Sequence, residues 1–240
     1  MRDATEAVGE GVTRMEITVL YDNERARTGV HTGWGFSALV GGDVLFDTGD
    51  DAAALGENMA ALDVTPTDID TIVLSHGHDD HVGGLPAVVE QNPEVDVVVP
   101  TESLATTVAK SVPETVDVSA AEESMRIRED VVTTGAVGES IREQGLVCQF
   151  QRGAVLLTGC AHPGLEALLD AARDTAAVVG VMGGFHDFAK LEALRELNFV
   201  SPCHCTQKKQ EITERFPDTT VRCGTGLVVG EDDVGAGAEI

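Results

Sequence analysis

The sequence predicts an α/β protein. Short apolar runs rich in Val, Ile and Leu recur along the whole chain, and amphipathic stretches of helical length separate many of them. Strands and helices mixed in this way are typical of a single α/β domain. No linker-like tract or fixed-period repeat divides the 240 residues. We therefore expect one domain over residues 1–240, with loose termini at about 1–14 and 231–240.

The apolar runs define the predicted strands. Val, Ile and Leu dominate them, and turn-forming or polar residues bound most of them. In chain order the predicted strands are Met15–Tyr21, Phe36–Val40, Val44–Phe46, Thr71–Ser75, Val95–Val99, Leu146–Phe150, Ala154–Thr158, Ala177–Met182, Asn198–Ser201, Thr219–Arg222 and Gly226–Val229.

Helices are predicted between several of these strands. They are Asp50–Leu62, Leu85–Gln91, Gly164–Arg173, Asp187–Leu197 and Thr206–Phe216. Leu side chains form a stripe on two of them, and Asp187 and Thr206 are suitable N-caps. The segment Glu102–Ser119 is ambiguous and suits a short helix followed by a loop.

The charge of the chain restricts its partners. Lys and Arg total 16 against 41 Asp and Glu, a net charge of −25. Such a surface repels phosphate backbones and anionic membranes, so we expect neither a nucleic-acid nor a membrane partner. Abundant acidic residues with only four Lys resemble proteins adapted to a salt-rich, halophilic cytosol, where salt screens the repulsion. No apolar run reaches the length of a membrane span, and residues 1–10 lack secretory features, so we expect a cytoplasmic protein.

Cysteine usage favours metal chemistry over a disulfide framework. The five Cys are an odd number, and three of them lie close to His. For Cys203 we expect a packing role. For Cys160 and Cys205 the sequence leaves open whether they bind a metal or pack behind it. Cys148 and Cys223 are expected in or near the core.

Five predicted strands each run into a residue that can bind a metal or move a proton. These residues are Asp47, His76, His162, His186 and His204. Loops at the carboxyl ends of sheet strands are where α/β proteins build their sites, because a rigid scaffold directs several side chains to one place. The sequence therefore predicts a site at these strand ends.

The densest cluster of potential ligands is the segment Ser75–His81, of sequence SHGHDDH. On an extended segment residues i and i+2 point the same way, so His76 and His78 can reach one metal. Asp80 and His81 then turn with the chain into the next helix and can face a second metal. Imidazole and carboxylate ligands suit Zn²⁺, Mn²⁺ or Fe²⁺ rather than Ca²⁺.

These motifs resemble the metallo-β-lactamase superfamily. LFDTG (45–49) and SHGHDDHVGG (75–84) are general features of that superfamily. TGCAH (158–162), GGFH (183–186) and PCHC (202–205), in this order, resemble a branch named for 7,8-dihydropterin-6-methyl-4-(β-D-ribofuranosyl)aminobenzene-5'-phosphate synthase. The resemblance spans roughly residues 15–229 and implies a four-layer αββα sandwich with a metal site where the two sheets meet.

The resemblance also implies two divalent metal ions, with zinc favoured and manganese or iron as alternatives. The implied ligands are His76, His78 and His162 for one ion, the first triad, and Asp80, His81 and His204 for the other, the second triad. Asp47 would orient a ligand His or a bound water through a hydrogen bond.

One position departs from the superfamily pattern. The strand that usually ends in a metal-bridging Asp here ends in Gly183-Gly184-Phe185-His186, with Asp187 next. Three alternatives follow: Asp187 reaches in, His186 binds a metal or the substrate, or the second metal site is weak. We favour His186 as a substrate contact or proton donor.

The expected function is that of a hydrolase, in which a metal-bound hydroxide attacks an ester, lactone, thioester or phosphoester of a small molecule. The alternative is the branch activity, a transferase that joins a dihydropterin to an aminobenzene-ribose phosphate. A non-catalytic metal sensor is disfavoured, because the ligand set is intact. The substrate could be anionic, since Lys208-Lys209 is a rare basic spot, although an exposed helix face explains that pair better. The sequence leaves homo-oligomerisation open.

Overall fold

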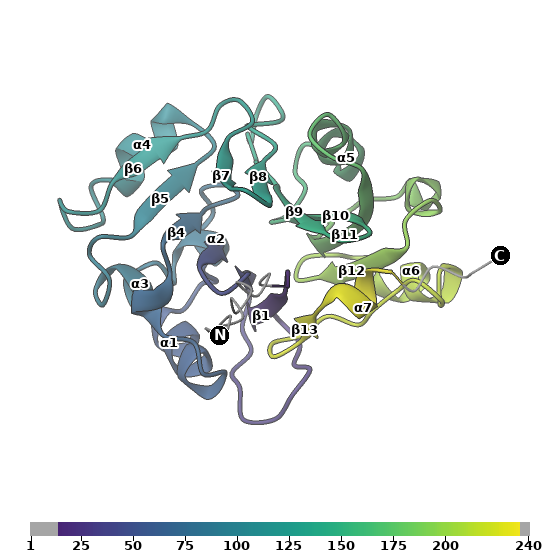
Figure 1. The fold of residues 1–240 in the computed structure, drawn as a ribbon, viewed down its shortest axis with the longest axis horizontal. Coiled ribbons are helices and arrows are strands. Elements are labelled where there is room, and N and C mark those ends of the chain that lie inside the picture. The colour runs from purple at the N-terminus through teal and green to yellow at the C-terminus, as the bar shows by residue number, and fades with distance from the viewer. Residues whose placement is uncertain (1–13, 236–240) are drawn as a thin grey trace, which may run out of the picture.

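Two β-sheets form the centre of the computed structural model, which describes residues 14–235 (Figure 1). The first sheet has the strand order β13-β1-β2-β3-β4-β5-β6. Its strands are β1 (Ile17–Tyr21), β2 (Ser37–Val40), β3 (Val44–Phe46), β4 (Thr71–Val73), β5 (Asp96–Val99), β6 (Val118–Ala120) and β13 (Val228–Val229). The second sheet has the order β12-β11-β10-β9-β8-β7. Its strands are β7 (Arg126–Arg128), β8 (Val131–Thr133), β9 (Leu146–Phe150), β10 (Gly153–Thr158), β11 (Val178–Gly184) and β12 (Phe199–Cys203).

The helices are short. The α-helices are α1 (Ala52–Ala61), α2 (Asp79–Val82), α3 (Pro86–Val89), α4 (Glu102–Val108), α5 (Leu165–Arg173), α6 (Lys209–Arg215) and α7 (Glu231–Val234). Two 3₁₀ helices are η1 (Pro66–Asp68) and η2 (Leu191–Leu194). None of the helices within residues 14–235 is long and apolar enough to cross a membrane.

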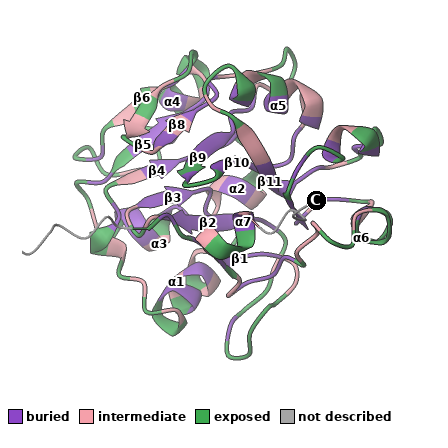
Figure 2. Ribbon diagram, turned by 45° about the vertical axis from the view of Figure 1, so that its right-hand side comes forward, coloured by how far each residue is buried: buried purple, intermediate pink, exposed green. Residues whose placement is uncertain are grey.

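Three apolar clusters show the layers of the molecule. The central cluster contains Phe46 of the first sheet and Phe150 of the second, and so lies between the sheets. A second cluster packs Leu55 of α1, with α3 and α4, against the outer face of the first sheet. A third packs Leu168 of α5 against the second sheet. Figure 2 shows the strands buried between these helical layers. The expected four-layer αββα sandwich is confirmed.

The sheet topology brings several strand ends to one edge. In the first sheet β3 and β4 are parallel, and in the second β10, β11 and β12 are parallel. Parallel neighbours end on the same side of a sheet, so the segments that follow them meet there. All five potential site residues predicted at strand ends follow these five strands.

The predicted helix Asp187–Leu197 is wrong. The chain forms only η2 there, and Asp187 caps no helix. The reason lies in the spacing of its apolar residues: Leu191, Leu194 and Leu197 recur every third position, and all three are buried. This spacing matches the three residues per turn of a 3₁₀ helix better than the 3.6 of an α-helix.

Other elements differ in extent. Thr219–Arg222 is not a strand and contributes only an isolated bridge between Thr220 and Val200. Strands β6, β7 and β8 were not predicted. Each has only three residues, and most of their positions are exposed or half-buried, so no apolar run marks them in the sequence. The expected loose tail from residue 231 is partly wrong, since α7 buries Val234 in the central cluster. The rest of the two expected loose termini, apart from exposed Arg14, lies outside the described residues.

Cys203 and Cys223 form a disulfide, which corrects the expectation of unpaired thiols at these two positions. The bridge between Val200 and Thr220 places the end of β12 beside the segment that carries Cys223. The Cα atoms of the two cysteines are consequently 5.3 Å apart. Cys148, Cys160 and Cys205 are free thiols.

Candidate metal centre

The first triad comes together from both sheets. His76 and His78 lie in the segment between β4 and α2, and Nε2 of His76 is 3.1 Å from Nδ1 of His78. His162 arrives from the loop after β10, and its ring centroid lies 4.8 Å from that of His76 and 4.9 Å from that of His78. The i, i+2 geometry expected for His76 and His78 is therefore present.

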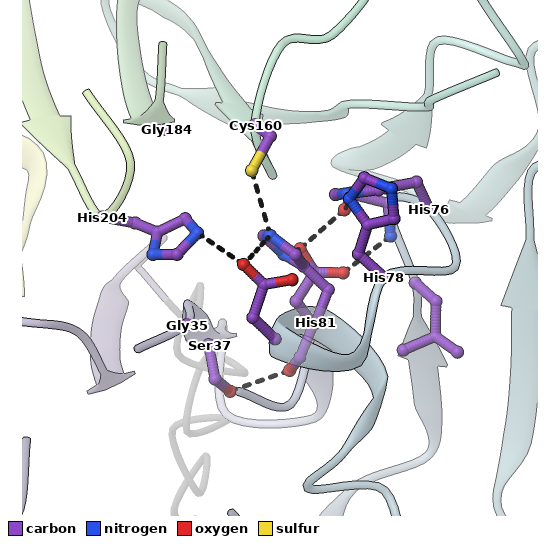
Figure 3. Close-up of polar contacts among 12 residues, drawn as sticks. Gly35, Ser37, His76, His78, His81, Cys160, Gly184 and His204 are labelled. Atoms are coloured by element: carbon purple, nitrogen blue, oxygen red, sulfur yellow. Dashed lines mark hydrogen bonds and ion pairs between the residues drawn. The ribbon is translucent and has the colours of Figure 1, made fainter. Parts of the chain in front are cut away.

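The second triad also draws on both sheets. Asp80 and His81 lie on α2, and His204 follows β12. The Oδ2 atom of Asp80 is 3.2 Å from Nε2 of His204 and 3.8 Å from Nε2 of His81 (Figure 3). Gly84 lets the chain pack closely at the end of this helix, because a Cβ there would lie 1.9 Å from the carbonyl oxygen of Thr48.

Both triads fit metal ions. The Nε2 atom of His162 is buried and has no hydrogen-bond partner among the described residues. The buried Nε2 of His204 faces the carboxylate of Asp80 at 3.2 Å, but the two groups do not meet with hydrogen-bond geometry. Orphaned buried nitrogens are costly unless something binds them. Two nitrogen ligands of one tetrahedral zinc ion lie about 3.4 Å apart, given Zn–N bonds of about 2.0–2.1 Å. The 3.1 Å between His76 and His78 is close to that separation.

Asp47 connects the two triads. It follows β3 and is buried. Its Oδ1 accepts from the backbone N–H of Ser75, and its Oδ2 accepts from the Ser75 hydroxyl and from Nδ1 of His81, each at 2.7 Å. Because the Ser75 hydroxyl donates its proton to Asp47, Ser75 accepts from Nδ1 of His76 at 2.9 Å. Asp47 thus fixes His81 directly and His76 through Ser75, and both rings turn Nε2 toward the centre.

His204 is held by two residues that the sequence analysis missed. Nδ1 of His204 donates to the side-chain oxygen of Asn23 at 3.0 Å, and the backbone N–H of His204 donates to the buried carboxylate of Asp22 at 2.7 Å. These contacts stabilise His204 at a φ of 44°, which is unusual for a residue with a side chain. Asp22 and Asn23 directly follow β1, so the strand-end rule could have found them.

The loop that carries His162 is organised by Glu143, another residue that the sequence analysis missed. Its carboxylate accepts the backbone N–H groups of Cys160, Ala161 and His162, each at 2.9 Å. Burial raises the pKa of Glu143, and these three hydrogen bonds oppose the increase. No sequence motif marks this residue, because its role depends only on where the loop folds.

Burial favours neutral imidazoles at three of the ligand positions. It lowers the pKa of His76, of His162 (to about 4) and of His204, and neighbouring imidazoles add to the effect. Neutral rings keep the lone pairs that a metal needs. His81 differs: burial opposes its charge, but the carboxylates of Asp47 and Asp80 outweigh burial and raise its pKa.

His186 and Asp187 lie at the rim of the site. The ring of His186 is 5.1 Å from that of His162, and its side chain is 42% exposed. The side chain of Asp187 is 84% exposed, and a carboxylate oxygen lies 3.5 Å from Nδ1 of His186. Asp187 therefore does not reach between the triads, which removes one of the three alternatives for the missing bridging residue.

Two thiols lie beside the triads. The Sγ of Cys160 is 3.2 Å from Nε2 of His81 (Figure 3) and 3.3 Å from the Sγ of Cys205. They occupy the space in front of Gly184, where an added Cβ would lie 2.7 Å from the Sγ of Cys205. The sequence singled out both cysteines without assigning them a role.

A cavity opens next to the first triad. It has a volume of about 540 Å³ and is lined by His76 and His78 together with Leu104, Ile141 and Arg142. The guanidinium of Arg142 pairs with Glu122 at 3.1 Å. On the side of the second triad, the 56% exposed Trp34 packs edge-on to His204 with ring centroids 4.9 Å apart. The cavity gives a small molecule access to the first triad.

A family model of the metallo-beta-lactamase superfamily matches residues 35–200. The chain belongs to this superfamily. It is 24% identical to the 7,8-dihydropterin-6-methyl-4-(beta-D-ribofuranosyl)-aminobenzene-5'-phosphate synthase of Methanocaldococcus jannaschii, over 78% of this chain and 83% of the relative.

Solved structures of the same superfamily are similar to this chain. The metal-dependent hydrolase Tm1679 shares 26% identity and a TM-score of 0.75, covering 90% of this chain and 98% of that one. The metallo-beta-lactamase fold protein YhfI from Bacillus subtilis has a TM-score of 0.65 at 14% identity, over 90% of this chain and 99% of YhfI, a likeness of fold.

Proposed function

We propose that this protein is a metal-dependent hydrolase that cleaves an ester, lactone, thioester or phosphoester of a small molecule. The observation that carries the proposal is the convergence of the two triads, with a buried nitrogen of His162 that has no hydrogen-bond partner among the described residues. Membership of the superfamily and the similarity to a metal-dependent hydrolase support it.

In this proposal the first triad and the second triad each hold one divalent ion. The ions, zinc in the first instance, supply Lewis acidity and lower the pKa of water toward neutrality. Imidazole and carboxylate donors also suit manganese and iron. The buried side chains of Asp47 and Ser75 and the half-buried side chain of Asn23 keep the ligand side chains oriented before any ion arrives.

Residues around the triads take the remaining roles. The cavity beside His76 and His78 accommodates the substrate, and its wall carries Arg142 together with Glu122 and Glu139. His186 stands at the open side of His162 with an exposed ring, where it contacts the substrate or gives a proton to the leaving group. The net charge of −25 disfavours nucleic-acid substrates.

The test combines metal content with activity. The protein is purified in high salt without chelator, its metals are quantified by plasma mass spectrometry, and esters, lactones, thioesters and phosphoesters are screened. We expect two ions per chain and turnover that His76→Ala and His162→Ala both abolish. His31→Ala is the matched control, because this exposed His pairs with Glu57 away from the triads. Full activity in the two triad variants would refute the proposal.

A second candidate is a transferase that joins a dihydropterin to an aminobenzene-ribose phosphate. The synthase named above favours it weakly, at 24% identity over most of both chains. Exposed Trp34 beside His204 offers a flat surface on which a pterin ring would stack. The metal-loaded protein is incubated with a dihydropterin diphosphate and the ribose phosphate, and the products are analysed by mass spectrometry. Absence of the coupled product would eliminate this candidate.

A further inference from the structure

One sulfur atom lies between the two triads. The Sγ of Cys160, the carboxylate of Asp80 and the rings of His81 and His204 offer ligand atoms that all lie within 4.8 Å of one another. The same cysteine forms a second such group with His76 and His162. Among the described residues, Cys160 is the member that both groups share.

The side chain is aimed at the centre and shielded from solvent. Cys160 is 3% exposed, and its Sγ is 3.2 Å from Nε2 of His81 (Figure 3). A nitrogen and a sulfur bound to one tetrahedral zinc ion lie about 3.5 Å apart, given bond lengths of about 2.0–2.1 and 2.3 Å. Its position is therefore compatible with binding the same ion as His81.

The end of strand β11 supplies no carboxylate between the triads. The strand ends in Gly184, and a Cβ added there would lie 2.3 Å from the carbonyl oxygen of Gly159, 2.7 Å from the Sγ of Cys205 and 3.2 Å from the Cα of Cys160. The neighbouring candidate, Asp187, has an exposed carboxylate. The two cysteines thus fill the volume into which a side chain from the end of β11 would project.

We propose that Cys160 is a thiolate ligand of the ion held by the second triad, completing a set of one carboxylate, two imidazoles and one sulfur. This inference rests on the proposed metal centre. On binding, the thiol proton leaves to solvent as the sulfur–metal bond forms. Three buried backbone hydrogen bonds to Glu143 fix the loop from Cys160 to His162, so both ligands on that loop are positioned together.

In this proposal Cys205 is a positioning residue for the thiol of Cys160. Its Sγ lies 3.3 Å from that of Cys160, close enough for a hydrogen bond between the two thiols. Cys205 is the residue after His204, and its side chain is half-buried. Its S–H donor would stabilise a thiolate on Cys160 without itself touching the ion.

The experiment replaces the native metal with Co²⁺, because cobalt reports its ligands by colour. A thiolate bound to Co²⁺ gives a strong near-ultraviolet charge-transfer band, whereas nitrogen and oxygen ligands give only weak visible bands. We expect the intact protein to show the charge-transfer band and Cys160→Ala to lose it. Cys205→Ala and Cys148→Ala retain it, the latter being a buried thiol remote from the triads. Circular dichroism of each variant verifies folding.

Metal affinity gives a second readout. Loss of a hydrogen bond behind a ligand already weakens metal binding about 10–100-fold, so loss of the ligand itself should raise the Kd of one ion by at least about tenfold. Retention of the band in Cys160→Ala, or its absence from the intact protein while the visible cobalt bands are present, overturns the inference and leaves the metal centre standing. Failure of cobalt to bind at all refutes the proposed metal centre itself.

Discussion

The carboxylate of Asp47 and the imidazole of His81 form a buried pair, joined by a 2.7 Å hydrogen bond between Oδ2 and Nδ1. Since the carboxylate accepts this hydrogen bond, Nδ1 of His81 carries a proton, and Nε2 is the nitrogen whose lone pair is available to a metal when the ring is neutral. Nε2 is the atom that faces Asp80 and Cys160. The pair therefore determines which nitrogen His81 offers to a metal.

The first prediction concerns a substitution that removes the carboxylate of this pair. Asp47→Asn puts an amide against His81 and Ser75 and lets the ring adopt the wrong tautomer. We expect the affinity for one ion to fall about 10–100-fold, measured by competition with a chromogenic chelator. Asp218→Asn is the control, because Asp218 is exposed. Equal affinities in the two variants would mean that Asp47 does not orient a ligand.

The second prediction concerns the loop that Glu143 holds. Glu143→Gln replaces one carboxylate oxygen by an NH₂ group, which cannot accept a hydrogen bond, so at least one of the three backbone N–H groups from Cys160 to His162 loses its acceptor. We expect the free energy of unfolding to fall by about 1–3 kcal/mol, measured by urea denaturation. Glu114→Gln, at an exposed position, should have no comparable effect. A stability loss in Glu143→Gln no larger than in this control would contradict the role assigned to Glu143.

The third prediction is a pH dependence of stability. Burial, together with the hydrogen bond to Asp50, raises the pKa of Tyr21 above its usual value. The folded protein then binds the phenol proton more tightly than the unfolded chain. The resulting stability is complete below the unfolded pKa of about 10 and is lost as the pH rises toward the folded pKa.

Tyr21 is the single tyrosine of the chain, so its ionisation can be followed by ultraviolet absorbance without overlap from another tyrosine. We expect a titration midpoint above that of free tyrosine and a decline in unfolding free energy at alkaline pH. In Tyr21→Phe the part of this decline due to the phenol should disappear. A midpoint at the ordinary tyrosine value would contradict the prediction.

The fourth prediction is the effect of metal removal. An ion present at 100 times its Kd stabilises a folded protein by about 2.7 kcal/mol. For a chain of this size each kcal/mol shifts the Tm by about 2–4 °C. Dialysis against a chelator should therefore lower the Tm by roughly 5–10 °C, measured by calorimetry, and Zn²⁺ should restore it. Mg²⁺ is the control, since it binds imidazole poorly. An unchanged Tm after verified metal loss would show that the ion does not stabilise the fold.

Much of the site could be predicted because parallel strands end at one edge of a sheet. Asp47, His76, His162 and His204 follow strands that the structure contains, and their side chains meet at that edge. Their roles as metal ligands or ligand-orienting residues remain predictions. Ser75 was overlooked because Ser, like Asp and Asn, is common where strands run into turns, so its polarity carries little information.

Other features depend on distant parts of the chain. Glu143 acts on a loop that only the folded second sheet brings to it. The disulfide between Cys203 and Cys223 depends on the β-bridge between Val200 and Thr220, and no local sequence pattern predicts that bridge. The prediction of an α-helix at Asp187–Leu197 was wrong for a local reason. Apolar residues at every third position were interpreted as an α-helical pattern, although this spacing matches a 3₁₀ helix.

Each triad takes ligands from both sheets, and this has a consequence for the order of assembly. In the first triad, His76 and His78 follow a strand of the first sheet, and His162 follows a strand of the second. In the second triad, Asp80 and His81 lie on α2 in the first half of the chain, and His204 follows β12, the last strand of the second sheet. A growing chain therefore lacks a complete first triad until the loop after β10 has formed, and a complete second triad until β12 has formed. In the proposed metal centre each ion would bind late in folding and would cross-link the two halves of the chain.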